Sequence, residues 1–227
     1  MLQYQDKEAK AMKQKRFAAF LMAAVLLLCA GSAQALGNKM MGNIKYGVPV
    51  PYENLVYGYA LNVHARFDMY GDAVMEYYLK QLDEEQDEND DYIYDARVWR
   101  SPDAKYLLEI QVKEPTYETF AQEIEKAPYY AEELLKRQED TQKQQVKQLH
   151  DGILRDTPAG QMLEMAISYL TTADDDSTVP TTAVYYDFYA NGYEYVFILT
   201  SFNGTYEDTQ KLLDSIMQTV AIWQVAA

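Results

Sequence analysis

One segment constrains the fold of this chain more than any other: VYYDFYANGYEYVFILTSF, at residues 184–202. Asn191-Gly192 separates two runs of aromatic and β-branched residues. Because both central residues of a type I′ turn need positive φ, the segment predicts a β-hairpin with a two-residue loop. That loop length sets the cross-strand pairs as Phe188 with Tyr195, Tyr186 with Phe197, Val184 with Leu199, Tyr185 with Ile198, and Asp187 with Val196. Both faces are largely apolar, so we expect the hairpin to lie inside a sheet that is covered on both sides.

A second hairpin is expected over residues 92–114, where Ser-Pro-Asp-Ala-Lys supplies the turn and the ring of Pro102 sets φ in advance. Its second strand alternates between core-facing and water-facing side chains, which are Tyr106, Leu108, Ile110 and Val112 against Leu107, Glu109, Gln111 and Lys113. Two further strands are expected, at 57–63 and 160–172. One face of the latter is formed by Leu163, Met165, Ile167 and Tyr169.

Helical patterns fill the segments between these strands. Residues 116–126 and 128–150 predict two helices, or one helix kinked at Pro128, because a proline ring suits the first turn of a helix and breaks its interior. A closing helix begins after Thr205 with a variant of the capping box, and a shorter helix is expected near 72–82. The closing helix presents an apolar stripe of Leu212, Leu213, Ile216, Met217 and Val220. These elements predict an α+β fold, in which a mainly antiparallel sheet packs against helices.

The half of the chain from Gly160 onward resembles the C-terminal half of PsbP-like domains, through the strand GQMLEMAISYLTT, the hairpin at 184–202 and the helix TYEDTQKLLDSIMQTV. The strand SPDAKYLLEIQVKE and the segment TYETFAQEI extend the similarity to about residues 92–222. These domains are α/β/α sandwiches shared with the photosystem II extrinsic P subunit and the Ran-release factors. The resemblance implies a single globular domain over residues 36–227 that acts as a non-catalytic binding or assembly module, and it offers no active-site residue to carry over.

The N-terminus has the pattern of a secretory signal peptide. An uncharged, mostly apolar run at residues 17–30 follows the basic segment KQKR, and Ala33-Gln34-Ala35 matches the A-x-A site of signal peptidase. The run is shorter than the ~20 residues that a spanning helix needs, so we expect cleavage after residue 35 and a secreted or periplasmic protein that does not span the membrane. Met12 begins a signal of ordinary length, so residues 1–11 need not be translated.

We expect the mature protein to begin at Leu36 and to carry no lipid. Cys29 is the only cysteine of the chain, and Leu28 stands before it where lipoprotein peptidase accepts Gly or Ala. The intact mass of the exported protein tests this expectation. A chain that starts at Cys29 with the added mass of a diacylglyceryl group would contradict it.

The chain is strongly acidic, with 35 Asp and Glu against 20 Lys and Arg and a formal net charge of −15. Residues 36–227 keep 33 acidic and 15 basic side chains, so their formal charge is −18. Phosphate backbones repel such a protein, and we therefore expect no nucleic-acid partner. With no cysteine in these residues, the fold depends on its core rather than on disulfides.

We expect no metal site and no other cofactor. Asp87, Asn89 and Asp91 match the first three ligand positions of a calcium-binding EF-hand loop, but Tyr92 stands where the loop needs glycine and Val98 where it needs glutamate. The two histidines, His64 and His150, lack the close spacing of zinc ligands. We interpret His64 as the end of an apolar strand and His150 as the end of a helix.

Nucleophilic catalysis has no support in the sequence, since residues 36–227 contain no cysteine and no G-x-S-x-G motif. We therefore do not expect an enzyme. The alternative is a carboxylate-based hydrolase acting on envelope glycans, because the many acidic side chains leave carboxylate pairs open. A deep cleft with two facing carboxylates would favour this alternative, and a shallow surface lined with tyrosines would favour a binding module.

Tyrosine is abundant, with 20 in residues 36–227, and most are expected to pack on strands. The pairs Tyr77-Tyr78 and Tyr129-Tyr130 fall instead on expected helices. Successive side chains of a helix point about 100° apart, so one tyrosine of each pair can anchor to the sheet while the other is exposed. We therefore predict these four as ligand-binding residues of an exported module whose partner is a protein or a cell-envelope component.

Overall fold

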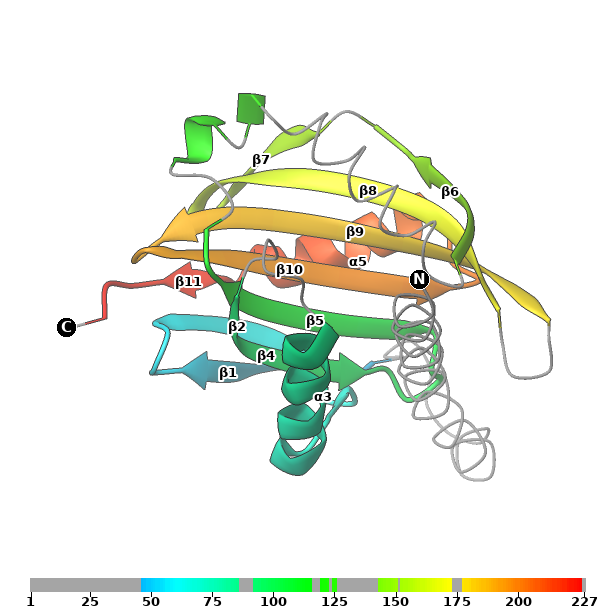
Figure 1. The fold of residues 1–227 in the computed structure, drawn as a ribbon, viewed down its shortest axis with the longest axis horizontal. Helices are drawn as coiled ribbons and strands as arrows, with labels where there is room; N and C mark the ends of the chain where they lie inside the picture. The colour runs from blue at the N-terminus through cyan, green and yellow to red at the C-terminus, as the bar shows by residue number, and fades with distance from the viewer. Residues whose placement is uncertain are drawn as a thin grey trace, which may run out of the picture.

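Two antiparallel sheets and two helices make up the described part of the protein (Figure 1). The computed structural model describes residues 46–85, 92–115, 119–122, 124–125, 143–150, 152–172 and 177–225. The larger sheet consists, in spatial order, of β3 (Asp68–Met69), β4 (Ile93–Arg100), β5 (Tyr106–Lys113), β10 (Tyr193–Phe202), β9 (Thr178–Ala190), β8 (Gly160–Thr172) and β6 (Lys143–Gln148), with β7 (Ile153–Thr157) also paired to β8. The smaller sheet consists of β1 (Pro49–Asn54), β2 (Tyr59–His64) and β11 (Ala221–Ile222).

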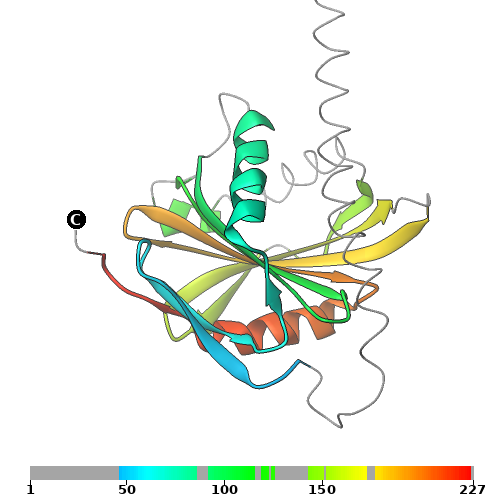
Figure 2. The same ribbon diagram turned by 90° about the horizontal axis from the view of Figure 1, so that it is seen from below.

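The larger sheet is covered on both faces (Figure 2). Helix α5 (Tyr206–Met217) and the smaller sheet lie on one face, and α3 (Asp72–Glu85) lies on the other. The main core forms on the α5 side, where side chains of β2 and α5 pack on β5, β9 and β10. The α+β prediction is confirmed, but an α/β/α sandwich describes this sheet-rich fold only loosely, because a three-stranded sheet shares one layer with α5.

The hairpin at residues 184–202 forms as predicted. All five expected cross-strand pairs occur between β9 and β10, and Asn191 and Gly192 have φ values of 56° and 78°. Tyr186, Tyr195 and Phe197 have no accessible surface and lie in the main core. On the opposite face Tyr185 and Ile198 pack around a second cluster. The two-residue loop thus sets the predicted register, which puts the expected side chains on each face of the hairpin. Both strands lie in the interior of the larger sheet.

Helices α3 and α5 confirm the predicted helices at 72–82 and after Thr205. The Thr205 side chain accepts a hydrogen bond from the Asp208 backbone N–H at 3.1 Å, which caps α5. Met75 of α3 packs on Ala96 and Val98 of β4. No helix in the described residues is long and apolar enough to cross a membrane.

The second predicted hairpin forms as β4 and β5, but the expected exposure of Lys113 is wrong. This side chain lies on the face of β5 that should meet water, yet the residue is only 6% exposed. Its ammonium nitrogen lies 2.8 Å from Oε1 of Glu194, its partner across the β5–β10 register. The buried Glu194 carboxylate pairs with the lysine, and this pairing allows the Lys113 side chain to be buried.

The predicted helix at 128–150 is also wrong at its end. Residues 143–148 form β6, which pairs with β8, and His150 lies between β6 and β7 rather than at a helix C-terminus. Pairing to the open side of β8 overrides the helical preference of this polar segment. Helical backbone is described at residues 120–122 and 124–125 of the other predicted helix.

Candidate functional site

The predicted pair on α3 has the expected geometry. Tyr77 is 43% exposed, whereas Tyr78 is half-buried and its hydroxyl donates to Glu109 Oε1 on β5 at 2.8 Å. One ring therefore anchors to the sheet while the other is open to solvent. Tyr129 and Tyr130 lie outside the described residues, and so do Ala33 and Ala35 of the expected cleavage site.

A larger group of tyrosines, which sequence reasoning missed, lies at one end of the molecule. We call Tyr57, Tyr92, Tyr94 and Tyr193 the tyrosine ladder, because their rings contact one another in a row. Ring centroids are 5.0 Å apart for Tyr92–Tyr94, 5.3 Å for Tyr94–Tyr193 and 5.4 Å for Tyr57–Tyr193, with interplanar angles of 74°, 75° and 86°. These near-perpendicular contacts are a favourable geometry for aromatic pairs.

Three chain segments meet to form the ladder. Tyr57 comes from the β1–β2 turn, Tyr92 and Tyr94 from the start of β4, and Tyr193 from the start of β10. The Tyr195 hydroxyl donates to the Tyr57 carbonyl at 2.6 Å, and the Tyr57 hydroxyl donates to the Tyr94 carbonyl at 3.2 Å. These bonds attach the turn to the larger sheet, so the rings are held by strands on two sheets rather than by one loop.

The segment directly after β11 packs against the same turn. The Trp223 N–H donates to the Gly58 carbonyl at 2.9 Å, and the Asn191 amide donates to the Trp223 carbonyl at 2.8 Å. Gly58 has φ +68°, and a Cβ there would lie 2.5 Å from the Trp223 carbonyl oxygen. Only glycine fits this turn without strain, because both the backbone conformation and the close approach exclude a side chain.

Large exposed side chains gather around the ladder. Tyr92 is 49% and Tyr94 40% exposed, and the β1–β2 turn adds Leu55 and Val56, each 71% exposed. Trp223 is exposed beside Gly58. In Figure 1 the β1–β2 turn, the β9–β10 turn and the end of β11 lie together at the left of the molecule. Exposed aromatic and aliphatic side chains that gather in this way are typical of an interaction surface.

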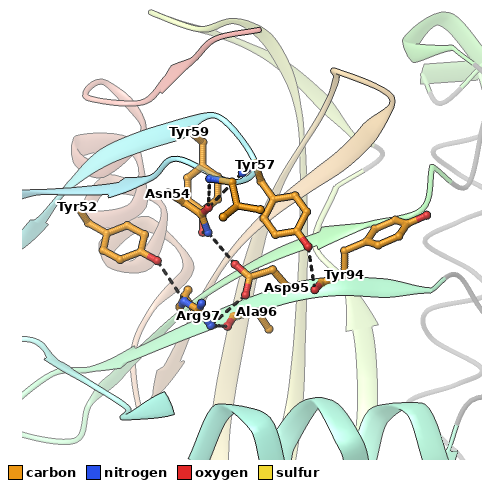
Figure 3. Close-up of polar contacts among 9 residues, drawn as sticks. Tyr52, Asn54, Tyr57, Tyr59, Tyr94, Asp95, Ala96 and Arg97 are labelled. Atoms are coloured by element: carbon orange, nitrogen blue, oxygen red, sulfur yellow. Dashed lines mark hydrogen bonds and ion pairs between the residues drawn. The ribbon is translucent and has the colours of Figure 1, made fainter. Parts of the chain in front are cut away.

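A polar network lies beside Tyr57 and Tyr94 of the ladder (Figure 3). The Asn54 side chain accepts from the Val56 and Tyr57 N–H groups, each at 3.1 Å, which shapes the turn, and donates to Asp95 Oδ2 at 2.8 Å. Asp95 Oδ1 lies 2.9 Å from a guanidinium nitrogen of Arg97. The network therefore connects β1 to β4, and within it the Asp95 carboxylate is paired with the Arg97 guanidinium.

The electrostatics of this network follow from burial and pairing. Burial raises the pKa of Asp95 above its ordinary value, although the Arg97 charge and the Asn54 hydrogen bond oppose the rise. Burial, together with the nearby Asp95 carboxylate, also raises the pKa of Tyr57. The hydroxyl of Tyr57 thus stays protonated at neutral pH, and the charges of Asp95 and Arg97 compensate each other.

A second polar cluster surrounds Glu164, which has no accessible surface. Its carboxylate accepts from Tyr206 at 2.6 Å, Arg155 Nε at 2.7 Å and Tyr186 at 3.0 Å. His150 Nε2 lies 3.1 Å from Oε1. The Tyr186 hydroxyl is also 2.8 Å from Asp214 Oδ1, so Glu164 and Asp214 share one phenol between them. The cluster connects β7, β8, β9 and α5, and its central carboxylate has no surface from which to reach a substrate.

The described residues contain no group of three or more His, Cys, Asp or Glu side chains that could hold a metal ion. Asp87, Asn89 and Asp91 lie outside those residues. His64 ends β2 as expected, with Nδ1 3.2 Å from the Gly47 carbonyl and its ring beside Tyr46 and Phe67.

The protein has a PsbP-like fold, which confirms the fold that the resemblance in the sequence implied. The solution structure of cyanobacterial PsbP (CyanoP) from Synechocystis sp. PCC 6803 is similar to it with a TM-score of 0.50, covering 83% of this chain and 99% of that one at 13% identity. An identity this low shows a shared fold alone. The sequence matches no family model and no curated protein.

Two other solved structures are more distantly similar. The Saccharomyces cerevisiae Ran-binding protein Mog1p has a TM-score of 0.44 and 8% identity, covering 78% of this chain and 97% of that one. LpqN, which is involved in cell envelope biogenesis of Mycobacterium tuberculosis, has a TM-score of 0.31 and 12% identity, covering 80% of this chain and 86% of that one.

Proposed function

We propose that this protein is an exported, non-catalytic binding or assembly module that recognises a protein or envelope partner through the tyrosine ladder. The observation that carries the proposal is the ladder itself, four rings in contact at one end of the fold with two of them 40% exposed or more. Tyrosine offers a large contact area at a low cost in side-chain entropy, which suits a recognition surface. The signal peptide pattern and the PsbP-like fold support the same function.

The predicted tyrosines on α3 are a separate surface from the ladder. Tyr77 presents a single exposed ring, because Tyr78 is held against the sheet by Glu109. The ladder joins several rings with exposed aliphatic and indole groups nearby. Since binding energy concentrates where large side chains cluster, the ladder is the stronger candidate and Tyr77 serves as its matched comparison.

Affinity capture from the native envelope tests the proposal. We expect one or more partners to be retained by the wild-type protein and by Tyr77→Ala, and to be lost or reduced at least tenfold with Tyr94→Ala/Tyr193→Ala. Circular dichroism and denaturation must first show that the variants fold. Equal capture by the wild-type protein and the double variant would overturn the assignment to the ladder, and loss with Tyr77→Ala alone would move the surface to α3.

The same purified protein decides between binding and hydrolysis. Incubation with envelope glycan is expected to release no new reducing ends above a boiled control. Turnover that survives in the ladder variant but is lost on replacing a surface carboxylate would contradict the non-catalytic proposal as a whole.

A further inference from the structure

We infer that the tyrosine ladder binds a segment of a partner protein that carries Lys or Arg side chains, an inference that rests on the proposed function. In an edge-to-face row each ring shields a face of its neighbour with an edge, so the solvent side of the row presents a mixture of ring faces and edges. The faces of Tyr92 and Tyr94 carry the negative part of the aromatic quadrupole, which attracts a cation.

The charges around the ladder are also anionic. Two cations of the described residues near the ladder are already paired, Arg97 with Asp95 at 2.9 Å and Lys113 with Glu194 at 2.8 Å. Glu114, whose backbone N–H donates to the Tyr92 carbonyl at 2.7 Å, is an exposed acidic residue at the rim of the ladder. The local balance is therefore negative, in agreement with the net charge of −15 for the whole chain.

These two features select a cationic protein segment over the other ligands of aromatic surfaces. A neutral sugar stacks best on a flat aromatic platform, whereas neighbouring ladder rings lie at 74° to 86° to one another and so cannot form one flat platform together. An acidic peptide or a phosphate group would be repelled by the rim. Lysine and arginine gain from both features at once, because the ring face attracts the cation and a carboxylate at the rim can pair with it.

Calorimetric titration with a tetra-arginine peptide, blocked at both ends, tests the inference. Tetra-citrulline is the neutral control of similar shape, and tetra-glutamate is the anionic control. We expect saturable binding of tetra-arginine at one site, about tenfold weaker binding to Tyr94→Leu/Tyr193→Leu, and no heat with either control peptide. Glu114→Gln is expected to weaken binding severalfold, whereas Glu76→Gln, which removes an exposed carboxylate from α3, leaves it within error.

The outcomes separate this inference from the proposed function. Equal binding of tetra-arginine to the ladder variant and the wild-type protein, or equal effects of Glu114→Gln and Glu76→Gln, would show attraction to overall charge and overturn the inference. If tetra-arginine does not bind but partner capture still depends on Tyr94 and Tyr193, only the cationic partner is wrong. Loss of ladder dependence in the capture experiment would overturn both.

Discussion

Replacing Lys113 with Met is expected to lower the free energy of unfolding by roughly 3–5 kcal/mol, because it leaves the Glu194 carboxylate buried without its cation. The two side chains are 8% and 2% exposed, and their charged atoms lie 2.8 Å apart across the paired strands β5 and β10. The Tyr189 hydroxyl also donates to Glu194 at 3.0 Å, but one phenol cannot replace a positive charge. The unfolded chain hydrates both groups, so the full cost falls on the folded state.

Urea denaturation at neutral pH measures this effect. The matched control is Lys211→Met on α5, an exposed position where the change is expected within about 0.5 kcal/mol. The double variant Lys113→Met/Glu194→Met is expected to recover most of the loss, since removal of both charges leaves no uncompensated ion. A cost for Lys113→Met no larger than that of Lys211→Met would show that Glu194 finds another partner or water.

The parts of the fold that were predicted correctly are those set by local chemistry. Asn191-Gly192 determines a turn, the turn determines a register, and the register determines which side chains meet. Of the small sheet, only β2 was predicted, as the expected strand at 57–63. Pro49 and Pro51 argue against a strand in β1, but β1 is an edge strand, where a missing N–H costs no ladder bond. β11 is only two residues long.

Long-range pairing explains the two incorrect predictions. The β6 segment is polar and reads as a helix, and only the open side of β8 makes it a strand. Lys113 alternates with apolar residues as a water-facing side chain should, and its partner Glu194 lies 81 residues further along the chain. In both cases the deciding partner, β8 or Glu194, lies in another segment of the chain. The local sequence alone therefore could not predict the strand or the buried lysine.

The candidate site was missed for the same reason. Exposed aromatic side chains were expected as adjacent tyrosines on helices, whereas the ladder combines Tyr57, Tyr193 and the Tyr92/Tyr94 pair from three separate segments. One local signal was present, since Tyr92 and Tyr94 stand two residues apart at a strand start and so share a face. Tyr193, directly after the predicted turn, stands at the same kind of strand end.

Replacing Glu164 with Gln is expected to lower the free energy of unfolding by about 3 kcal/mol at neutral pH. A carboxylate accepts from all its neighbours, whereas the amide nitrogen of glutamine would face the Arg155, Tyr186 or Tyr206 donors. Arg155 is one-third exposed and can turn to water, which limits the loss. Glu76→Gln on the surface of α3 is the charge-matched control and is expected within about 0.5 kcal/mol.

The pH dependence of that difference tests the electrostatic cause. Burial would raise the pKa of Glu164, but the hydrogen bonds from Arg155, Tyr206 and Tyr186 and the charge of Arg155 outweigh it, so the pKa lies below its ordinary value of 4.5. A lowered carboxylate pKa stabilises the fold above pH 4.5, and this stabilisation is lost as the pH falls through the folded-state pKa. The stability difference between the wild-type protein and Glu164→Gln should therefore shrink below pH 4.5. The raised pKa of Asp95 acts in the opposite direction, but both proteins contain Asp95, so it cancels from the difference. A difference that stays constant down to pH 3 would indicate that glutamine disturbs the packing of this cluster rather than its charge.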